Sequence, residues 1–255
     1  MTGKPGADSY VPITSQIGGK SLIRVATELY GEPPAFWGRY FSSLATRGSA
    51  EYRRSEEGDA LREAGIRVLP IARQTRRVGG SESDGAADAV RNSEDILTTF
   101  GIDCLARQGG SLFVFLDVEG DPRLSVAYYT GWAETLKEHS AEISGGSASL
   151  VPCVYAAQKD VATWTALSAA CRGGIPCGGA WVARWRNNPS YTLPPWDDAF
   201  IQPTIALPCP ILLWQYAANC HGSGGFDCSQ TNPQLDFAYL QSHLVLPPAR
   251  EVKTS

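Results

Sequence analysis

The feature that most constrains the fold is the alternation of short apolar runs with helical stretches along most of the chain. The clearest run, Ser111–Asp117, is apolar almost throughout, as a parallel strand covered on both faces should be. The stretch 85–100 carries apolar residues at helical spacing and ends at Gly101, a typical helix terminator. Strands that alternate with helices in this way are typical of βαβ units around a parallel sheet.

Eight segments qualify as strands, and four of the stretches between them qualify as helices. The expected strands are Tyr10–Thr14, Ala35–Phe41, Ile66–Ala72, Ser111–Asp117, Leu150–Ala156, Gly179–Trp185, Ile211–Ala217 and Gly225–Cys228. The expected helices cover 51–65, 85–100, 125–138 and 160–171.

The length of 255 residues matches the roughly 250 that are typical of one (β/α)8 barrel. A closed barrel also accommodates eight strands without the two exposed edges of an open sheet. We therefore predict an α/β fold, a single TIM-like (β/α)8 barrel of regular or irregular form, with a long loop at the proline-rich stretch 194–210. The barrel domain is expected to cover residues 10–245, with flexible ends at 1–9 and 246–255.

Charge and hydropathy exclude several classes of protein. The net charge of −4 and the pI near 5.4 argue against a nucleic-acid-binding protein. The arginine-rich run 53–77 contains several acidic residues, so it predicts either a solvated helix face or a patch for an anionic ligand. No apolar stretch approaches the roughly 18 to 20 residues of a membrane-spanning helix. We expect a monomer that needs no metal or cofactor.

Seven cysteines are many for a cytosolic protein of this length. Cys171 with Cys177, and Cys220 with Cys228, are close enough in sequence to close small loops; the alternative is buried free thiols. The amino-terminal segment lacks the apolar core of a secretory signal peptide. Either a signal was removed, or export follows another route, or the protein stays inside the cell; the cysteines favour a secreted or periplasmic destination.

Asp117 and Glu119 are the strongest candidates for catalysis. They stand two residues apart at the end of an apolar strand, so both side chains are expected on the same side, at the mouth of the barrel. Glycoside hydrolysis needs two such carboxylates, one to protonate the leaving oxygen and one to stabilise positive charge or attack. Acidic residues also end strands simply because loops are polar, so the pair gains weight only from its surroundings.

Aromatic and polar residues near the predicted strand ends supply those surroundings. Flat aromatic faces suit stacking on sugar rings, and amide or guanidinium groups suit hydrogen bonds to hydroxyls. The same aromatic residues could instead pack between strands and helices. The residues expected to bind substrate are Arg39, Tyr40, Gln74, Tyr155, Trp181, Trp185, Trp214 and Gln215.

Taken in order, these segments resemble the glycoside-hydrolase-like domain of unknown function that is related to the family 25 lysozymes. The resemblance covers roughly residues 10 to 240. It rests on short motifs: Gly38–Tyr40, Pro70 with Gln74, Phe115–Glu119, Pro152–Tyr155, Trp181–Ala183 and Trp214–Tyr216.

The resemblance implies an irregular barrel that cleaves β-1,4 bonds of peptidoglycan glycan strands. It implies Glu119 as the general acid and Asp117 as the residue that stabilises the reacting sugar, with Asp227 as a further carboxylate and Asp236 as a weaker match for it. Such domains also carry an aspartate on the first strand, where Pro12 is the expected equivalent here and Asp8 lies too far upstream to be a clear substitute. If that carboxylate is missing, the alternative is a barrel that binds cell-wall glycan or another polysaccharide without cleaving it.

Overall fold

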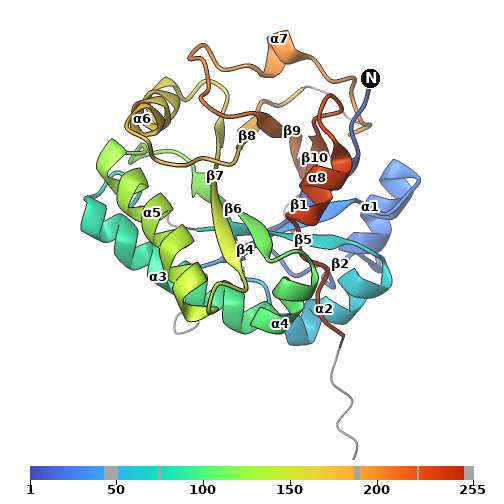
Figure 1. Cartoon of the computed structure of the whole chain (residues 1–255). Coiled ribbons are helices and arrows are strands. Elements are labelled where there is room, and N and C mark those ends of the chain that lie inside the picture. Colours follow the sequence, from blue (N-terminus) through green and yellow to red (C-terminus); the bar gives the residue numbers. More distant parts are fainter. Residues whose placement is uncertain (43–50, 74–75, 187–189, 223, 250–255) are drawn as a thin grey trace, which may run out of the picture.

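The computed structural model describes residues 1–42, 51–73, 76–186, 190–222 and 224–249. Its centre is a closed barrel of eight strands in the order β1-β10-β9-β8-β7-β6-β5-β4 (Figure 1). The strands are β1 (Pro5–Asp8), β4 (Phe36–Phe41), β5 (Arg67–Ala72), β6 (Ser111–Val118), β7 (Ser149–Ala157), β8 (Ala180–Ala183), β9 (Ile211–Cys220) and β10 (Phe226–Thr231). This confirms the predicted α/β barrel.

The barrel is irregular because one of its strands runs against the others. β10 pairs antiparallel with both β9 and β1, whereas every other neighbouring pair is parallel. A two-stranded ribbon, β2 (Gln16–Ile17) with β3 (Lys20–Ser21), follows the first strand. The antiparallel strand needs no crossover helix, so β10 begins at Phe226, only a few residues after β9 ends at Cys220.

Helices cover the outside of the barrel. They are α1 (Leu22–Tyr30), α2 (Arg54–Glu63), α3 (Glu82–Phe100), α4 (Ile102–Arg107), α5 (Val126–Ile143), α6 (Val161–Arg172), α7 (Asp198–Ile201) and α8 (Phe237–Ser242). The four predicted helices correspond to α2, α3, α5 and α6. None of the described helices is long and apolar enough to cross a membrane.

The first strand was placed wrongly from the sequence. Residues 10–14 form no strand, and the amino-terminal segment that was expected to be flexible instead contains β1, whose four residues are all buried. Gly6 explains why β1 has no large apolar residues: a Cβ there would lie 2.1 Å from the ring of Phe36. Phe36 of the neighbouring strand fills the space, so β1 can be built from small residues.

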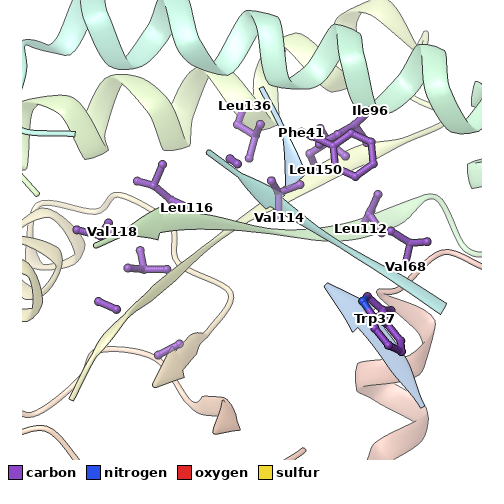
Figure 2. Packing of buried hydrophobic residues seen from close by; sticks show 14 of the residues in the cluster. Trp37, Phe41, Val68, Ile96, Leu112, Val114, Leu116, Val118, Leu136 and Leu150 are labelled. Carbon is purple, nitrogen blue, oxygen red and sulfur yellow. The ribbon is translucent and has the colours of Figure 1, made fainter. Parts of the chain in front are cut away.

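Alternating residues of each strand separate two apolar cores. Phe113 and Phe115 of β6 point into the barrel, whereas Val114 and Leu116 point outward into the layer beneath the helices. Figure 2 shows Val114 and Leu116 on the side that faces Ile96 of α3 and Leu136 of α5. Residues with the parity of Phe115 therefore reach the barrel mouth when they follow the end of the strand.

The cysteines are free thiols in the structure, and no disulfide is formed between them. Two sulfur pairs are nevertheless close: the Sγ atoms of Cys220 and Cys228 lie 2.8 Å apart, and those of Cys177 and Cys209 lie 3.4 Å apart. The first pair connects neighbouring strands β9 and β10. Cys220 and Cys228 close one of the two small loops predicted from sequence spacing, and their sulfur-to-sulfur distance is longer than a bond.

Candidate active site

Asp8 ends β1 and supplies the first-strand carboxylate. The prediction that Pro12 occupies this position is wrong. In the register of the barrel it lies opposite Asp227 on β10 and Gly38 on β4. Its side chain is only 4% exposed. A Cβ at position 38 would lie 2.7 Å from the Cβ of Asp8, so glycine there leaves room for the inward-facing carboxylate.

Asp117 and Glu119 occupy the mouth as their strand parity predicts. Asp117 is the inward-facing residue near the end of β6 and is buried, with its Oδ1 unpartnered. Glu119 follows one residue after the strand and is exposed to solvent. The two carboxylates therefore differ in access: Asp117 lies inside the barrel, and Glu119 can meet a ligand outside it.

Gln215 of β9 connects the carboxylates of β1 and β10. Its Nε2 donates to Oδ2 of Asp8 and to Oδ2 of Asp227, each at 3.2 Å. Its Oε1 accepts from the hydroxyl of Tyr155 at 2.9 Å and from Nε1 of Trp185 at 3.0 Å. These four contacts fix the orientation of the amide, with its nitrogen towards the acids and its oxygen towards the aromatic side chains.

Tyr155 extends this network to a third carboxylate, that of Glu119. Its hydroxyl, at the end of β7, also lies 3.2 Å from Oε1 of Glu119. One chain of hydrogen bonds thus joins Asp8, Asp227, Gln215, Tyr155 and Glu119, which come from strands or strand ends on five sides of the barrel. Asp117, on the strand beside Tyr155, is in register with it but outside that chain.

Burial and mutual repulsion raise the pKa values of three acids in this cluster. Desolvation, followed by the charge of Asp227, raises the pKa of Asp8 well above its usual range. Desolvation and then Glu119 raise the pKa of Asp117, and the charge of Arg73 opposes that shift. The pKa of Asp227 rises to about 6, mainly through desolvation, although the backbone N–H of Asn219 donates to its carboxylate at 2.7 Å. The cluster therefore retains protons towards neutral pH.

Aromatic side chains line the mouth above and around these acids. Trp185 is 59% exposed while its indole nitrogen is held by Gln215. Trp181 lies deeper, edge-on to Tyr155 at 5.0 Å between ring centroids, and forms part of the floor. Arg73 follows β5, with its guanidinium 5.1 Å from the ring centroid of Tyr10 and 5.4 Å from that of Tyr40.

A cavity of about 140 Å³ opens beside Asp8 and Asp227. Its wall includes Tyr10 and Tyr40, together with Asn219, Gly224 and Gly225. The residues just before β10 thus border the site. The mouth combines acids, aromatic faces and hydrogen-bonding groups, as binding of a polyhydroxylated ligand requires.

Two predicted substrate-binding residues lie elsewhere. Arg39 is fully buried outside the barrel, where its Nε and Nη2 donate to the carboxylate of Glu57 at 2.9 and 3.0 Å. Trp214 is fully buried under the loop that carries α7, packed on Phe200 with its Nε1 donating to the carbonyl of Arg184. Both have the outward parity of their strands, so the prediction that they contact substrate is wrong.

Most of the other predicted site residues do lie at the barrel mouth. Tyr40, Tyr155, Trp181, Trp185 and Gln215 all lie at or beneath the mouth, together with Asp117, Glu119 and Asp227. Gln74 falls outside the described residues. Asp236, the weaker candidate for the further carboxylate, instead caps α8 by accepting from the backbone of Ala238.

The sequence did not predict Arg73 as a site residue, and it placed Asp8 too far upstream to substitute for the first-strand aspartate. Arg73 follows directly after the predicted strand Ile66–Ala72, so its position one residue beyond a strand end was a usable signal. Asp8 follows a run of only four small residues, and nothing local distinguishes such a run from a loose terminus.

No protein-family model matches the sequence, and no curated protein matches it. Solved structures do match the fold. A crystal structure of an uncharacterized B. stearothermophilus protein is 22% identical, covering 95% of this chain and all of that one, with a TM-score of 0.65. The catalytic domain of endolysin ply40 from bacteriophage P40 of Listeria monocytogenes is 14% identical, covering 94% and 98%, with a TM-score of 0.53.

A family 25 glycosyl hydrolase from Bacillus anthracis is 11% identical, covering 95% of this chain and 94% of that one, with a TM-score of 0.50. The barrel has the fold of the family 25 lysozymes. At these identities the similarity establishes the architecture of this family-25-like barrel. Its chemistry depends on the residues that line its own mouth.

Proposed function

We propose that this family-25-like barrel is a glycoside hydrolase of the muramidase type, which cleaves β-1,4 bonds of bacterial cell-wall peptidoglycan. The observation that carries the proposal is the set of four carboxylates, from β1, β6, the segment after β6 and β10, around one barrel mouth. Like charges so close together are unfavourable for folding, so their presence points to chemistry.

Glu119 is the general acid of the proposed reaction. It is the exposed member of the four carboxylates, so it can reach a glycosidic oxygen outside the barrel. The Tyr155 hydroxyl has one hydrogen, and its nearer acceptor is Gln215. The Tyr155 hydroxyl also lies 3.2 Å from Oε1 of Glu119, so the tyrosine can orient the carboxyl group that would protonate the leaving oxygen.

Asp117 stabilises the charge of the reacting sugar in this proposal. In the free protein its pKa is raised by burial and by Glu119, so ionisation is unfavourable. A sugar that develops oxocarbenium character near the barrel mouth would favour the ionised form. The interaction would then strengthen as the transition state forms, which is the condition under which binding accelerates a reaction.

The cell-wall substrate is supported by two kinds of evidence. Trp185, Tyr10 and Tyr40 present aromatic surface at the mouth, which suits sugar rings. Among the structural neighbours are an endolysin catalytic domain and the Clostridium perfringens spore cortex lytic enzyme SleM, which is 15% identical with a TM-score of 0.53 over 90% of this chain and 67% of that one.

The non-catalytic alternative loses its main support with the position of Asp8. It depended on Pro12 replacing an acid of the first strand, whereas Asp8 ends that strand and faces the cluster. The mouth therefore retains the full set of carboxylates that hydrolysis was expected to need.

A destination outside the cytoplasm forms part of the proposal, since peptidoglycan lies there. The close sulfur atoms of Cys220 and Cys228 would allow a disulfide between β9 and β10 under oxidising conditions. Both thiols remaining free in protein purified from an oxidising compartment would count against this destination.

The decisive experiment is digestion of purified peptidoglycan, with the released muropeptides analysed by mass spectrometry. We expect cleavage of the glycan strand by the unmodified protein and a loss of about 10²- to 10⁴-fold with Glu119→Gln. Glu134→Gln, an exposed glutamate on α5, is the matched control and should retain full activity. Equal activity of the two variants would remove Glu119 from the mechanism, and co-sedimentation with the wall without cleavage would identify a binding protein.

A further inference from the structure

A second cavity, of about 480 Å³, lies outside the barrel and is lined by four arginines. Arg54 and Arg62 come from α2, Arg67 begins β5, and Arg107 ends α4. The chain segment 246–249 closes one side. In Figure 1 this segment leaves α8 and passes α2 and α4. Because Arg67 begins its strand, whereas the acidic site follows strand carboxyl ends, the cavity is remote from the barrel mouth.

The charges in this cavity are uncompensated. No acidic residue belongs to its lining, and within the described ranges none of the four arginines forms an ion pair with a carboxylate. Other arginines of the same region, Arg53 and Arg77, do pair with neighbouring acids. The arginine-rich run thus divides in two: part of it is a solvated, paired surface, and part of it faces a cavity. In a chain with a net charge of −4, this concentration of positive charge is local.

The guanidinium groups are positioned by neutral acceptors. Arg67 Nη1 donates to Oε1 of Gln108 at 3.0 Å and to the carbonyl of Leu244 at 2.9 Å. Arg62 Nη1 donates to the carbonyl of Pro247 at 2.8 Å. Gln108 in turn binds the main chain of Leu246 through both ends of its amide, at 2.8 and 2.9 Å. Arg62 and Arg67 are oriented in this way without having their charges neutralised, and several of their N–H groups stay available.

Arg67 shows that this arrangement is unfavourable without a counter-charge. The residue is half-buried, and burial lowers its pKa from the ordinary arginine value. A negatively charged ligand in the cavity would offset this desolvation. Planar guanidinium groups bind carboxylate and phosphate oxygens through paired hydrogen bonds, and a cavity of this volume falls in the range of small-molecule sites.

We propose that this cavity is a binding site for a multivalent oxyanion, a small molecule or polymer segment that carries at least two phosphate or carboxylate groups. Four guanidinium groups around one cavity favour a ligand with more than one negative charge. The site is independent of the proposed hydrolase activity, and it uses none of the residues of the barrel mouth.

The test is calorimetric titration of the full chain with pyrophosphate, citrate and inorganic phosphate at low ionic strength. We expect pyrophosphate or citrate to bind more tightly than inorganic phosphate, and the tighter of the two identifies phosphate or carboxylate as the preferred group. Binding should weaken with added NaCl. The double variant Arg54→Gln/Arg107→Gln should weaken it at least tenfold, since neither side chain has a short contact that folding needs.

Arg172→Gln is the control for loss of positive charge outside the cavity, because it removes an arginine at the end of α6 that does not line the cavity. It should leave the dissociation constant unchanged, as should Glu119→Gln at the barrel mouth. A dissociation constant raised equally by Arg172→Gln would reduce the effect to overall charge and overturn the proposal. Absence of binding by both pyrophosphate and citrate at millimolar concentration would also overturn it, whatever the outcome of the peptidoglycan assay.

Discussion

This barrel contains two groups of buried charges, one outside its wall and one inside its mouth, and they are organised in opposite ways. Outside the barrel, Arg39 and Glu57 neutralise each other through two hydrogen bonds, and Glu57 also accepts from the backbone N–H of Ile13 at 2.9 Å. Inside the mouth, Asp8 and Asp117 are buried among other acids with no buried cation of their own. The first group holds the fold together, and the second is unfavourable for folding.

The contrast separates structure from function. Glu57 and Arg39 fix the chain that follows β1, since Arg39 also donates to the carbonyl of Ser9. That segment must be in place for Asp8 to face the mouth. The Arg39–Glu57 pair outside the barrel therefore keeps the chain in the position that Asp8 needs. Removing a charge of this pair should lower the free energy of unfolding, whereas removing an acid of the mouth should raise it.

Arg39→Ala should give the largest effect. It leaves the carboxylate of Glu57 buried without its partner, which costs about 3 to 5 kcal/mol of unfolding free energy. Urea denaturation followed by circular dichroism measures this. Arg24→Ala, which removes an exposed pair with Glu28 on α1, is the control and should change the midpoint little. Similar midpoints for the two variants would mean that the buried pair does not hold the fold.

Asp8→Asn should have the opposite effect on stability. Removing one ionisable group from the acid cluster relieves its repulsion with Asp227 and should raise the free energy of unfolding at pH 7.5 by about 1 kcal/mol. Peptidoglycan cleavage should fall about tenfold or more, because one of the four carboxyl groups of the proposed site is lost. Thermal unfolding and the muropeptide assay measure both quantities. A variant that loses stability would place Asp8 among the structural charges.

The pH dependence of stability should follow the acids of the mouth. Their pKa values are raised in the folded protein, to about 6 for Asp227, so between pH 5 and 7.5 the folded state binds more protons than the unfolded chain. Stability should therefore decrease as pH rises through this window, by about 1 to 2 kcal/mol. Urea midpoints at pH 5, 6 and 7.5 test this, and Asp8→Asn should flatten the trend. A midpoint that rises with pH contradicts it.

Arg73→Gln should give the smallest effect. The guanidinium charge lowers the pKa of Asp117, so its removal should raise that pKa further and move the acidic limb of the activity profile to higher pH. The pH dependence of cleavage measures the shift. Arg73→Lys, which keeps the charge, should restore the original profile. An unchanged profile in Arg73→Gln would mean that solvent screens this exposed cation from Asp117.

The sequence by itself determined most of the barrel and part of the mouth. Alternating apolar and helical segments gave seven of the eight strands, because strand and helix periodicity are local properties of the chain. The spacing of Asp117 and Glu119 placed both on the inward side for the same reason. The order of the short motifs predicted the lysozyme-type fold, which the structural comparisons support.

Tertiary structure alone decided the first strand and the facing of the polar side chains. β1 exists through its pairing with β4 and β10, which are distant in sequence, and through Phe36, which fills the space above Gly6. Arg39 and Gln215 both follow apolar strand residues, yet one is buried with Glu57 and the other joins the acids. The choice depends on which side of each strand faces the barrel axis, and closure of the barrel fixes that side through contacts that no local pattern records.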